Sequence, residues 1–560
     1  MIRWHLWVNA IVNRSDRPLA NGFSRSLPHH PLDAIALIEA QVHQQLRALL
    51  REWGEPSWPH HLTLARLVAR ALRLGRSALL QVGGVSAYQG EYRLSYLIAL
   101  MMWPGPAVVV APEPTAQRLL MVDLPRLQEK LRLHKPVHRG DRWPSGEFNG
   151  LLITTPSAWL GDRLGDQSQF PGGIPTLIDD ADNLEQWVQE QLTAKLSPID
   201  WNHLTLAYPD HQKLIQDTHV ALTHAAFQRP ANPYRRYLLD EQDCQQLQRL
   251  HQVLTASRTP QAEGPMPPQW ARFWQQFNPP DHLLWFAVDR DRGQMTLHCA
   301  PVNLAPTLTP LWSLQPVVLI GAALDPEPAA DNFRQRLGLS ELTCLQFTPN
   351  RQNDAIQLYL PTHLPLPNTP QFQGVLHQEI RRLLSRDVET EAREVAEDLT
   401  HRPGFTVILL DDLPLKGQLG ATLAGEFGSR VQVEQASIGR NGILVSGWAF
   451  WRQHQALLPL PDLLIVATLP LPSLENPMVA GRVAFHKRRR QDWFRLYLFP
   501  TAVTELQRAI APSRQHQGTV ALLDTRVHYR SYGAQILEAL SPAACTRSRP
   551  ASRPRIPSYD

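Results

Sequence analysis

The chain has 560 residues and 43% of them are hydrophobic, so it is too long for one hydrophobic core and apolar enough for two to four domains. Its formal net charge of +4 is compatible with nucleic acid but does not require it. The four cysteines form no CxxC pair, which argues against a zinc site and a disulfide framework. No apolar run reaches the length of a membrane span, and we expect a cytoplasmic protein without membrane association.

The first half of the chain alternates between helical and strand-like patterns. Apolar residues at helical spacing predict helices over 31–53 and 62–75, which end at Gly54 and Gly75. The remaining segments read in order as a strand and loop, a helix, a strand, a helix and two strands: "SALLQVGG", "YRLSYLIALMMW", "PAVVVAPE", "TAQRLLMVDLPRLQEKL", "GLLITTPSAWL" and "IPTLIDD". This alternation predicts a parallel α/β sheet.

The pattern changes after Asp182. Residues 185–275 are mostly helical and rich in Gln, His and Leu, which predicts a helical insert or, alternatively, an independent helical domain. From about 283 the α/β pattern returns in the strand-like segments "HLLWFAVD", "PVVLIGAAL", "FTVILLDD", "GILVSGWAFW", "DLLIVATLPL" and "GTVALLDTRV". The tail "CTRSRPASRPRIPSYD" is basic and rich in Pro and Ser, a composition typical of disorder.

Two adjacent carboxylates, Asp179 and Asp180, follow a predicted buried strand. The carboxyl edge of a parallel sheet is where ligands bind, so Asp179 can hold a magnesium ion and Asp180 can orient a water for attack on a phosphate. The alternative is that Asp180 and Asp182 only cap the following helix and favour its dipole.

The order of the segments resembles the DinG/XPD-type DNA helicases of superfamily 2. "LIDDADNLE" at 177–185 is similar to the family's "VIDEAHNLE", "VVLIGAALD" to "ILTSATL", and "LLIVATLPLPSLENP" to "VIIAKLPFPSPDDP". About nine such segments follow in the family's order between residues 55 and 540. The resemblance implies two RecA-like parallel-sheet domains with a helical insert.

The resemblance and the patterns together give the following expected division of the chain. We expect an N-terminal helical segment (1–54), a first RecA-like domain (55–184 and 283–340) interrupted by the helical insert (185–282), a second RecA-like domain (341–540) and a disordered tail (541–560).

The nucleotide-binding loop departs from the family pattern. The resemblance implies ATP and Mg²⁺ as cofactors, held by a GxGxGKT loop. Gly83 and Gly84 remain, but Tyr92 and Arg93 stand where Lys and Thr belong, and the loop is a few residues longer. Arg93 can approach a phosphate, yet it lacks the hydroxyl that holds magnesium.

Other motifs are altered as well. Asp180 replaces the Glu that positions water, and Asp182 replaces a His, which adds negative charge beside the phosphate site. Gly321 and Ala323 replace the Ser and Thr of the third motif. In the last motif Gln507 is kept, and either Arg508 or Arg514 is the candidate arginine finger. His61 is the candidate for reading adenine. No Cys occurs between residues 1 and 243, so we expect no iron–sulfur cluster.

Two features point to nucleic acid. Lys487, Arg488, Arg489 and Arg490 lie beside aromatic residues, a pattern that can neutralise phosphates and stack bases, although a solvated helix face next to core aromatics explains it too. Trp451 falls at the family's DNA-contacting fifth motif, where a buried Trp is the alternative.

These observations predict a helicase-family protein that binds single-stranded DNA or another nucleic acid and has impaired or lost ATP hydrolysis. An unorthodox but active ATPase is one alternative. A catalytically silent scaffold for protein partners is the other.

Overall fold

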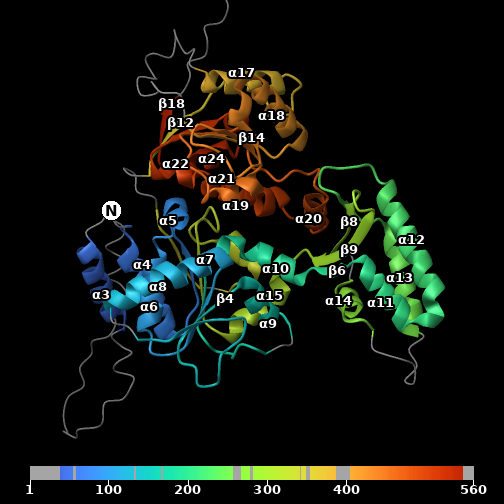
Figure 1. Cartoon of the computed structure of the whole chain (residues 1–560), viewed down its shortest axis with the longest axis horizontal. Helices are drawn as coiled ribbons and strands as arrows, with labels where there is room; N and C mark the ends of the chain where they lie inside the picture. Colours follow the sequence, from blue (N-terminus) through green and yellow to red (C-terminus); the bar gives the residue numbers. More distant parts are fainter. Residues whose placement is uncertain are drawn as a thin grey trace, which may run out of the picture.

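The computed structural model describes residues 38–53, 58–131, 134–165, 168–256, 266–277, 282–340, 342–348, 354–385 and 404–546. They form two lobes, one above the other, and a smaller insert at the side (Figure 1). The predicted start of the first helix at residue 31 and most of the basic tail lie outside the described residues.

The first lobe is built on a seven-stranded parallel sheet with the strand order β11-β1-β10-β5-β2-β4-β3. The strands are β1 (Ala78–Gln81), β2 (Ala107–Val110), β3 (Val137–Arg139), β4 (Leu151–Thr154), β5 (Thr176–Ile178), β10 (Val317–Gly321) and β11 (Thr343–Gln346). Every residue of β1, β2, β4, β5 and β10 is buried, as expected for a parallel sheet that is covered by helices on both faces.

Successive side chains of these strands enter different cores. Leu80 packs with the core that includes residues of α3, α4, α6 and α8, whereas Leu79 packs with the core that includes residues of α9, α10, α15 and α16. The helices of this lobe are α3 (Ile38–Trp53), α4 (His61–Leu74), α5 (Gly84–Gln89), α6 (Arg93–Met102), α7 (Glu113–Arg118), η1 (Leu119–Asp123), α8 (Leu124–Leu131), α9 (Pro156–Arg163), η2 (Ala181–Asn183), α10 (Leu184–Leu192), α15 (Ala305–Leu314) and α16 (Asp331–Leu337).

The insert contains an antiparallel sheet, which the sequence did not predict. Its strand order is β6-β9-β8-β7, with β6 (Ala194–Leu196), β7 (Arg236–Leu238), β8 (His282–Asp289) and β9 (Gln294–Pro301). The sequence pattern predicts that 283–289 belong to the returning first lobe, but β8 pairs with β7 and β9 instead. The insert helices are α11 (Pro198–Ala207), η3 (Pro209–His211), α12 (Gln212–Gln228), α13 (Glu241–Ala256) and α14 (Pro268–Gln276).

Burial on both faces explains why β8 reads like a core strand of a parallel sheet. Phe286 packs into the core formed with the insert helices, while Leu283 and Trp285 pack on the other face against Met478 of the second lobe. The chain therefore re-enters the first lobe only at α15.

The second lobe has its own seven-stranded parallel sheet, with the order β14-β15-β13-β16-β17-β12-β18. Its strands are β12 (Ile356–Tyr359), β13 (Thr406–Leu409), β14 (Val431–Val433), β15 (Ile443–Ser446), β16 (Leu463–Val466), β17 (Thr519–Leu522) and β18 (Ala543–Thr546). Its helices are α17 (Phe372–Leu384), α18 (Leu413–Phe427), η4 (Gly428–Arg430), α19 (Trp448–His454), α20 (Pro477–Arg488), η5 (Phe494–Leu498), α21 (Phe499–Ala509), α22 (Ala511–Gln515), α23 (Arg526–Tyr529) and α24 (Gly533–Ala539).

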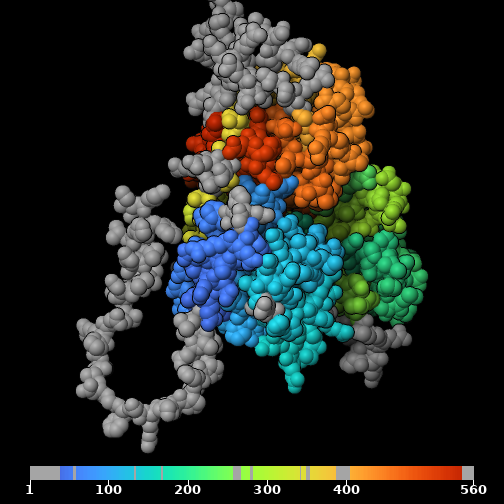
Figure 2. All heavy atoms as spheres, turned by 60° about the vertical axis from the view of Figure 1, so that its left-hand side comes forward, coloured from blue at the N-terminus to red at the C-terminus, as the bar shows by residue number. Residues whose placement is uncertain are grey.

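The chain crosses from one lobe to the other between Gln346 and Ile356, because β11 still pairs with β1 of the first sheet. The predicted border at residue 341 therefore lies just before the last strand of the first lobe. Figure 2 shows the second lobe, orange to red, seated on the first, with the green insert against the side of both.

Candidate nucleotide cleft

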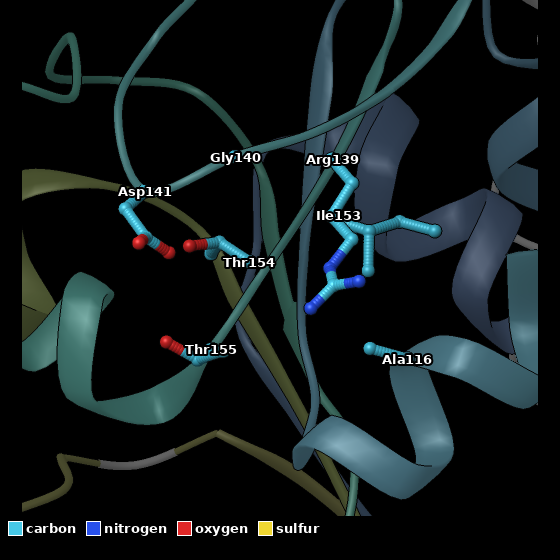
Figure 3. Close-up of a pocket in the computed structure, with 7 residues that line it drawn as sticks. All are labelled: Ala116, Arg139, Gly140, Asp141, Ile153, Thr154 and Thr155. Atoms are coloured by element: carbon cyan, nitrogen blue, oxygen red, sulfur yellow. The ribbon is translucent and has the colours of Figure 1, made fainter.

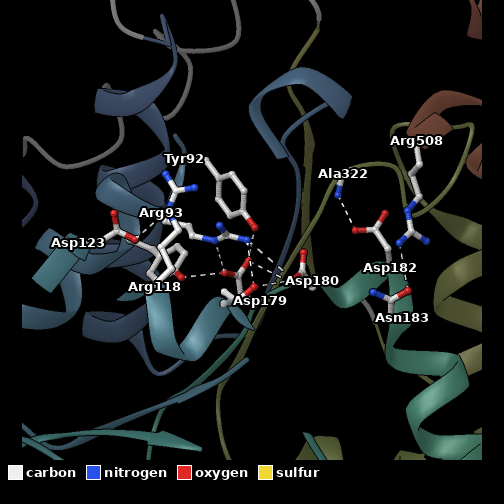
Figure 4. A network of polar contacts seen from close by, with 12 residues as sticks. Tyr92, Arg93, Arg118, Asp123, Asp179, Asp180, Asp182, Asn183, Ala322 and Arg508 are labelled. Carbon is white, nitrogen blue, oxygen red and sulfur yellow. Dashed lines mark hydrogen bonds and ion pairs between the residues drawn. The ribbon is translucent and has the colours of Figure 1, made fainter. Parts of the chain in front are cut away.

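Asp179 lies at the carboxyl end of β5, the central strand of the first sheet, and its side chain is fully buried. Four donors of the chain occupy its carboxylate (Figure 4). Oδ2 accepts from Arg93 Nε at 3.0 Å and from the Tyr96 hydroxyl at 2.9 Å. Oδ1 accepts from the Tyr92 hydroxyl and from the backbone N–H of Asp180. Asp179 is thus satisfied by protein groups alone.

Arg93 is the cation of this cluster. It begins α6 and is 7% exposed. Its Nη2 donates to Thr115 Oγ1 at 3.3 Å and lies 3.9 Å from Asp180 Oδ2. The guanidinium is thus turned toward the two carboxylates of the acidic motif, at the place where a cation held by Asp179 would lie. The sequence had suggested a phosphate contact for this residue.

Tyr92 is the N-cap of α6 and Tyr96 lies within α6, and both hydroxyls donate to the carboxylate of Asp179. Burial, followed by the charge of Asp179, raises the pKa of Tyr92 and of Tyr96 well above the usual 10. Both hydroxyls therefore keep their protons at neutral pH. Sequence reasoning missed Tyr96 and assigned Tyr92 no role. The available signal was a Tyr-Arg-x-x-Tyr pattern at the start of an otherwise apolar helix.

Asp180 has a left-handed backbone conformation, with φ of 56°, and its side chain is partly exposed. Burial, and then the charge of Asp179, raises the pKa of Asp180 to about 6. Its Oδ2 accepts a hydrogen bond of 3.2 Å from Thr115. Asp180 is therefore the carboxylate of the pair with access to solvent.

The carboxylate of Asp182 is held by the backbone at the end of β10. Its two oxygens accept the backbone N–H groups of Ala322 and Ala323 at 2.7 and 2.9 Å. A Cβ on Gly321 would lie 2.6 Å from Asp182 Oδ2. The changes in the acidic motif and in the third motif thus belong to one local arrangement.

Of the two glycines of the nucleotide loop, Gly84 contacts the other lobe. Gly83 has a φ of 82°, and Gly84 begins the short helix α5. A Cβ on Gly84 would lie 3.0 Å from the carbonyl oxygen of Gln507 and 3.3 Å from Ala511 Cβ. The main chain of Gln507 therefore abuts the loop that the family uses for phosphates.

The two candidate arginine fingers differ. Arg508 reaches the acidic motif, because its Nη2 donates to Asn183 Oδ1 at 3.1 Å (Figure 4). Arg514 is 4% exposed and donates to four carbonyl oxygens of its own lobe, those of Asp354, Leu540, Ser541 and Pro542. Burial lowers the pKa of Arg514 to about 10. Arg514 is thus a structural residue of its own lobe, and of the two arginines Arg508 is the one that contacts the acidic motif.

His61 is buried at the start of α4 and shares a hydrogen bond of 2.7 Å between its Nδ1 and Ser95 Oγ. Burial, followed by the neighbouring His60, lowers the pKa of His61 to about 4. This residue is a neutral helix-packing residue in the structure, rather than an exposed edge for adenine.

The residues proposed for nucleic acid fall into two groups. Lys487, Arg488, Arg489 and Arg490 are all exposed, at and just after the end of α20. Lys487 Nζ lies 5.4 Å from the centre of the Trp493 ring. In contrast, Trp451 is fully buried and donates to the carbonyl of Ala509, so it is a core residue and no base can stack on it.

A cavity of about 300 Å³ lies at the carboxyl ends of β3 and β4, and Figure 3 shows its lining. Thr154 is 2% exposed there, and its hydroxyl has no hydrogen-bond partner among the described residues. Arg139, on the wall, is paired with Glu113 at 2.5 Å, and Asp141 also lines the cavity. This balance of charge suits a neutral polar group better than a phosphate.

Among the described residues, no group of three or more His, Cys, Asp or Glu side chains could hold a metal ion. Within the same residues, no helix is long and apolar enough to cross a membrane.

Comparisons with known proteins find partial sequence similarity to curated helicases. No family model matches the chain. It is 24% identical over 289 residues to the ATP-dependent DNA helicase YoaA of Escherichia coli K12, a segment covering 49% of this chain and 43% of YoaA. It is 23% identical over 262 residues to YoaA of Haemophilus influenzae, covering 45% and 40%. The matches thus span less than half of these relatives.

Solved structures extend the likeness to most of the chain. The structure of S. tokodaii Xpd4 superposes with a TM-score of 0.55 at 12% identity and covers 87% of this chain and 100% of that one. An XPD helicase structure gives a TM-score of 0.56 at 11% identity, with 88% and 100% covered. The chain therefore has the two-lobed fold of the XPD helicase structures, and about half of it is similar in sequence to the YoaA helicases.

Proposed function

We propose that this protein binds nucleic acid on a helicase fold whose nucleotide cleft has lost ATP hydrolysis. The observation that carries the proposal is the saturation of Asp179 by Arg93, Tyr92, Tyr96 and the backbone N–H of Asp180. A magnesium ion needs free carboxylate lone pairs, and this carboxylate already accepts four hydrogen bonds inside the protein.

The remaining parts of the cleft support the same proposal. ATP and Mg²⁺ are the cofactors that the resemblance implies, and the residues present do not fit the metal. Arg93 places a positive charge against Asp179, so a divalent cation there would meet repulsion and would have to displace a buried ion pair. Of the predicted catalytic residues, Asp180 is partly exposed beside Asp179, and Arg508 contacts Asn183 of the acidic motif.

Nucleic-acid binding is proposed from the exposed basic segment 487–490, and single-stranded DNA is the ligand that we test. Arg489 also lines a groove of about 270 Å³ together with Arg336 and Arg482. Cations at the end of a helix are also favoured by its dipole, so this segment needs a direct test. The free thiols Cys244, Cys299 and Cys344 suit the reducing cytoplasm, which we propose as the compartment.

The test combines ATP turnover with binding of a labelled single strand. We expect wild-type protein to hydrolyse ATP no faster than Asp180→Asn, with or without DNA. Asp179→Ala is a poor control because that residue is buried in an ion pair. DNA-stimulated turnover that Asp180→Asn abolishes would refute the loss of hydrolysis.

The binding arm uses two or more salt concentrations. A variant with Lys487, Arg488 and Arg490 all changed to Gln removes up to three phosphate contacts. The slope of the logarithm of the DNA association constant against the logarithm of the salt concentration should then become shallower by about 2. A matched control changes Arg235, Arg249 and Arg272 of the insert to Gln. If both variants bind as wild type does, the basic segment is not the interface. If wild type shows no salt-dependent binding at all, a scaffold for protein partners is favoured instead.

A further inference from the structure

The extra residues of the nucleotide loop form a structural element of their own. Residues 84–92 follow Gly83, and the helix α5 and a turn at Gly90 occupy this stretch before α6 begins at Arg93. In Figure 1, α5 stands above the first lobe and directly under α22 of the second.

The contacts of α5 run to the second lobe at both ends of the helix. At its start, Gly84 packs so closely on the Gln507 carbonyl and Ala511 that a side chain would not fit without movement. Toward its end, the Tyr88 hydroxyl donates to the carbonyl of Gln455 at 3.2 Å. Burial, and then the charge of Asp354 in the second lobe, raises the pKa of the adjoining Glu91.

Further contacts fix the same arrangement of the lobes. Arg508 of the second lobe bonds to Asn183, as described above. Arg482, on α20, lies 3.4 Å from Glu185 Oε1 and donates to Gln189 Oε1 at 3.1 Å, both on α10 of the first lobe. These contacts and α5 connect the two lobes directly.

We infer that α5 is an internal bridge between the lobes, which holds them closed in place of a bound nucleotide. The inference rests on the proposed function, since it assigns the regulation of the same cleft. A nucleotide and its metal would place positive charge at the acidic motif and would connect the loop to the second lobe. Residues of the chain already do both. Arg93 neutralises the acidic motif, and α5 connects the loop to the second lobe.

The experiment measures the separation of the lobes by fluorescence energy transfer. Dyes are attached at Glu129→Cys on α8 and Ala421→Cys on α18, both exposed, in a background whose four native cysteines are replaced. We expect one narrow distance population in the wild type, unchanged by ATP with Mg²⁺. Gly84→Trp should broaden the distribution of dye-to-dye distances and increase its mean, because the indole would displace Gln507 and Ala511.

Two further variants keep the test sharp. Gly146→Trp is the matched control, since a Cβ at this exposed glycine meets nothing within 4 Å, and it should leave the distance unchanged. Ala511→Leu pushes on the same contact from the second lobe, so it should open the lobes even if Gly84→Trp fails to fold. Unchanged distances in Ala511→Leu and in folded Gly84→Trp would overturn the inference.

ATP turnover of the same samples separates the two proposals. If ATP changes the lobe separation without turnover, the inferred role of α5 as a bridge is overturned, and the proposed loss of hydrolysis is not affected. Turnover with no change in lobe separation would refute the loss of hydrolysis, and it would show that α5 joins the lobes alongside a bound nucleotide rather than in its place.

Discussion

Arg93 and Asp179 form an ion pair that is almost wholly removed from water, with side chains 9% and 0% exposed. Removing one partner of such a pair leaves an uncompensated charge, which costs about 3–5 kcal/mol. We expect Arg93→Met and Asp179→Asn each to lower the free energy of unfolding by about that amount. The double variant should lose less stability than the sum of the losses in the two single variants. Chemical denaturation of the wild type, the two single variants and the double variant measures the difference.

The matched control is an ion pair at the surface. Arg292 and Asp289 lie 3.8 Å apart with side chains 78% and 41% exposed, so Arg292→Met should change stability by less than about 0.5 kcal/mol. Strict additivity of the two buried substitutions would show that Arg93 and Asp179 do not interact as described.

Asp180 should make stability depend on pH. Its folded pKa of about 6 lies above the ordinary 3.8, so the folded protein binds the proton more tightly than the unfolded chain does. The contribution of Asp180 to stability is therefore fully present below about pH 4 and is lost as the pH rises through 6. We expect Asp180→Asn to stabilise the protein at pH 7–8 and to gain less at pH 4, as followed by denaturant unfolding.

A part of that gain is independent of pH, because Asn tolerates the left-handed backbone at this position better than most residues do. The difference between the two pH values is thus the informative quantity. An equal gain at pH 4 and pH 8 would mean that the carboxylate carries no electrostatic penalty.

At the scale of elements, the end of β10 and the acidic motif are fitted to each other. A Cβ on Gly321 would lie 2.4 Å from Leu324 Cδ2 and 2.6 Å from Asp182 Oδ2. We expect Gly321→Ala to cost about 1–3 kcal/mol through overpacking. The cost should shrink in an Asp182→Ala background, because the closest polar atom is then gone.

Gly374→Ala provides the reference for this prediction. Gly374 lies in α17 with no heavy atom within 4 Å of its would-be Cβ, so alanine there should be neutral or slightly stabilising. Equal costs at Gly321 and Gly374 in thermal unfolding would contradict the proposed fit between the two motifs.

The elements also show what a sequence pattern can predict. The fully buried strands β1, β2, β13 and β16 were predicted because each is a continuous apolar run bounded by turn residues. The edge strands β3 and β14 were not, since "VHR" and "VQV" are half exposed and carry no such signal. The antiparallel sheet of the insert was missed because β6 and β7 have three residues each.

Across the whole molecule, the ordered motifs predicted the two-lobed fold better than they predicted the site. In the structure Asp179 and Asp180 follow the central strand β5, and Arg508 contacts Asn183; their catalytic roles stay predictions. Motif position alone gives no information on burial. It could not tell that Arg514 and Trp451 are buried, because a motif says nothing about which side of a helix meets the core. The partners of Asp179 lie 83 to 87 residues away in sequence, so only the fold brings them together.

The contact between the insert and α20 has a mechanical consequence. Gly481 of α20 packs on Leu283 of β8 so closely that a Cβ would lie 2.6 Å from a Leu283 methyl group. Both ends of the insert are joined covalently to the first lobe, so this contact tethers the lobes at the side opposite α5. If the α5 bridge is released, the lobes stay joined at the α20–β8 contact and by the chain between Gln346 and Ile356. Release of α5 should therefore change the separation of the lobes without parting them.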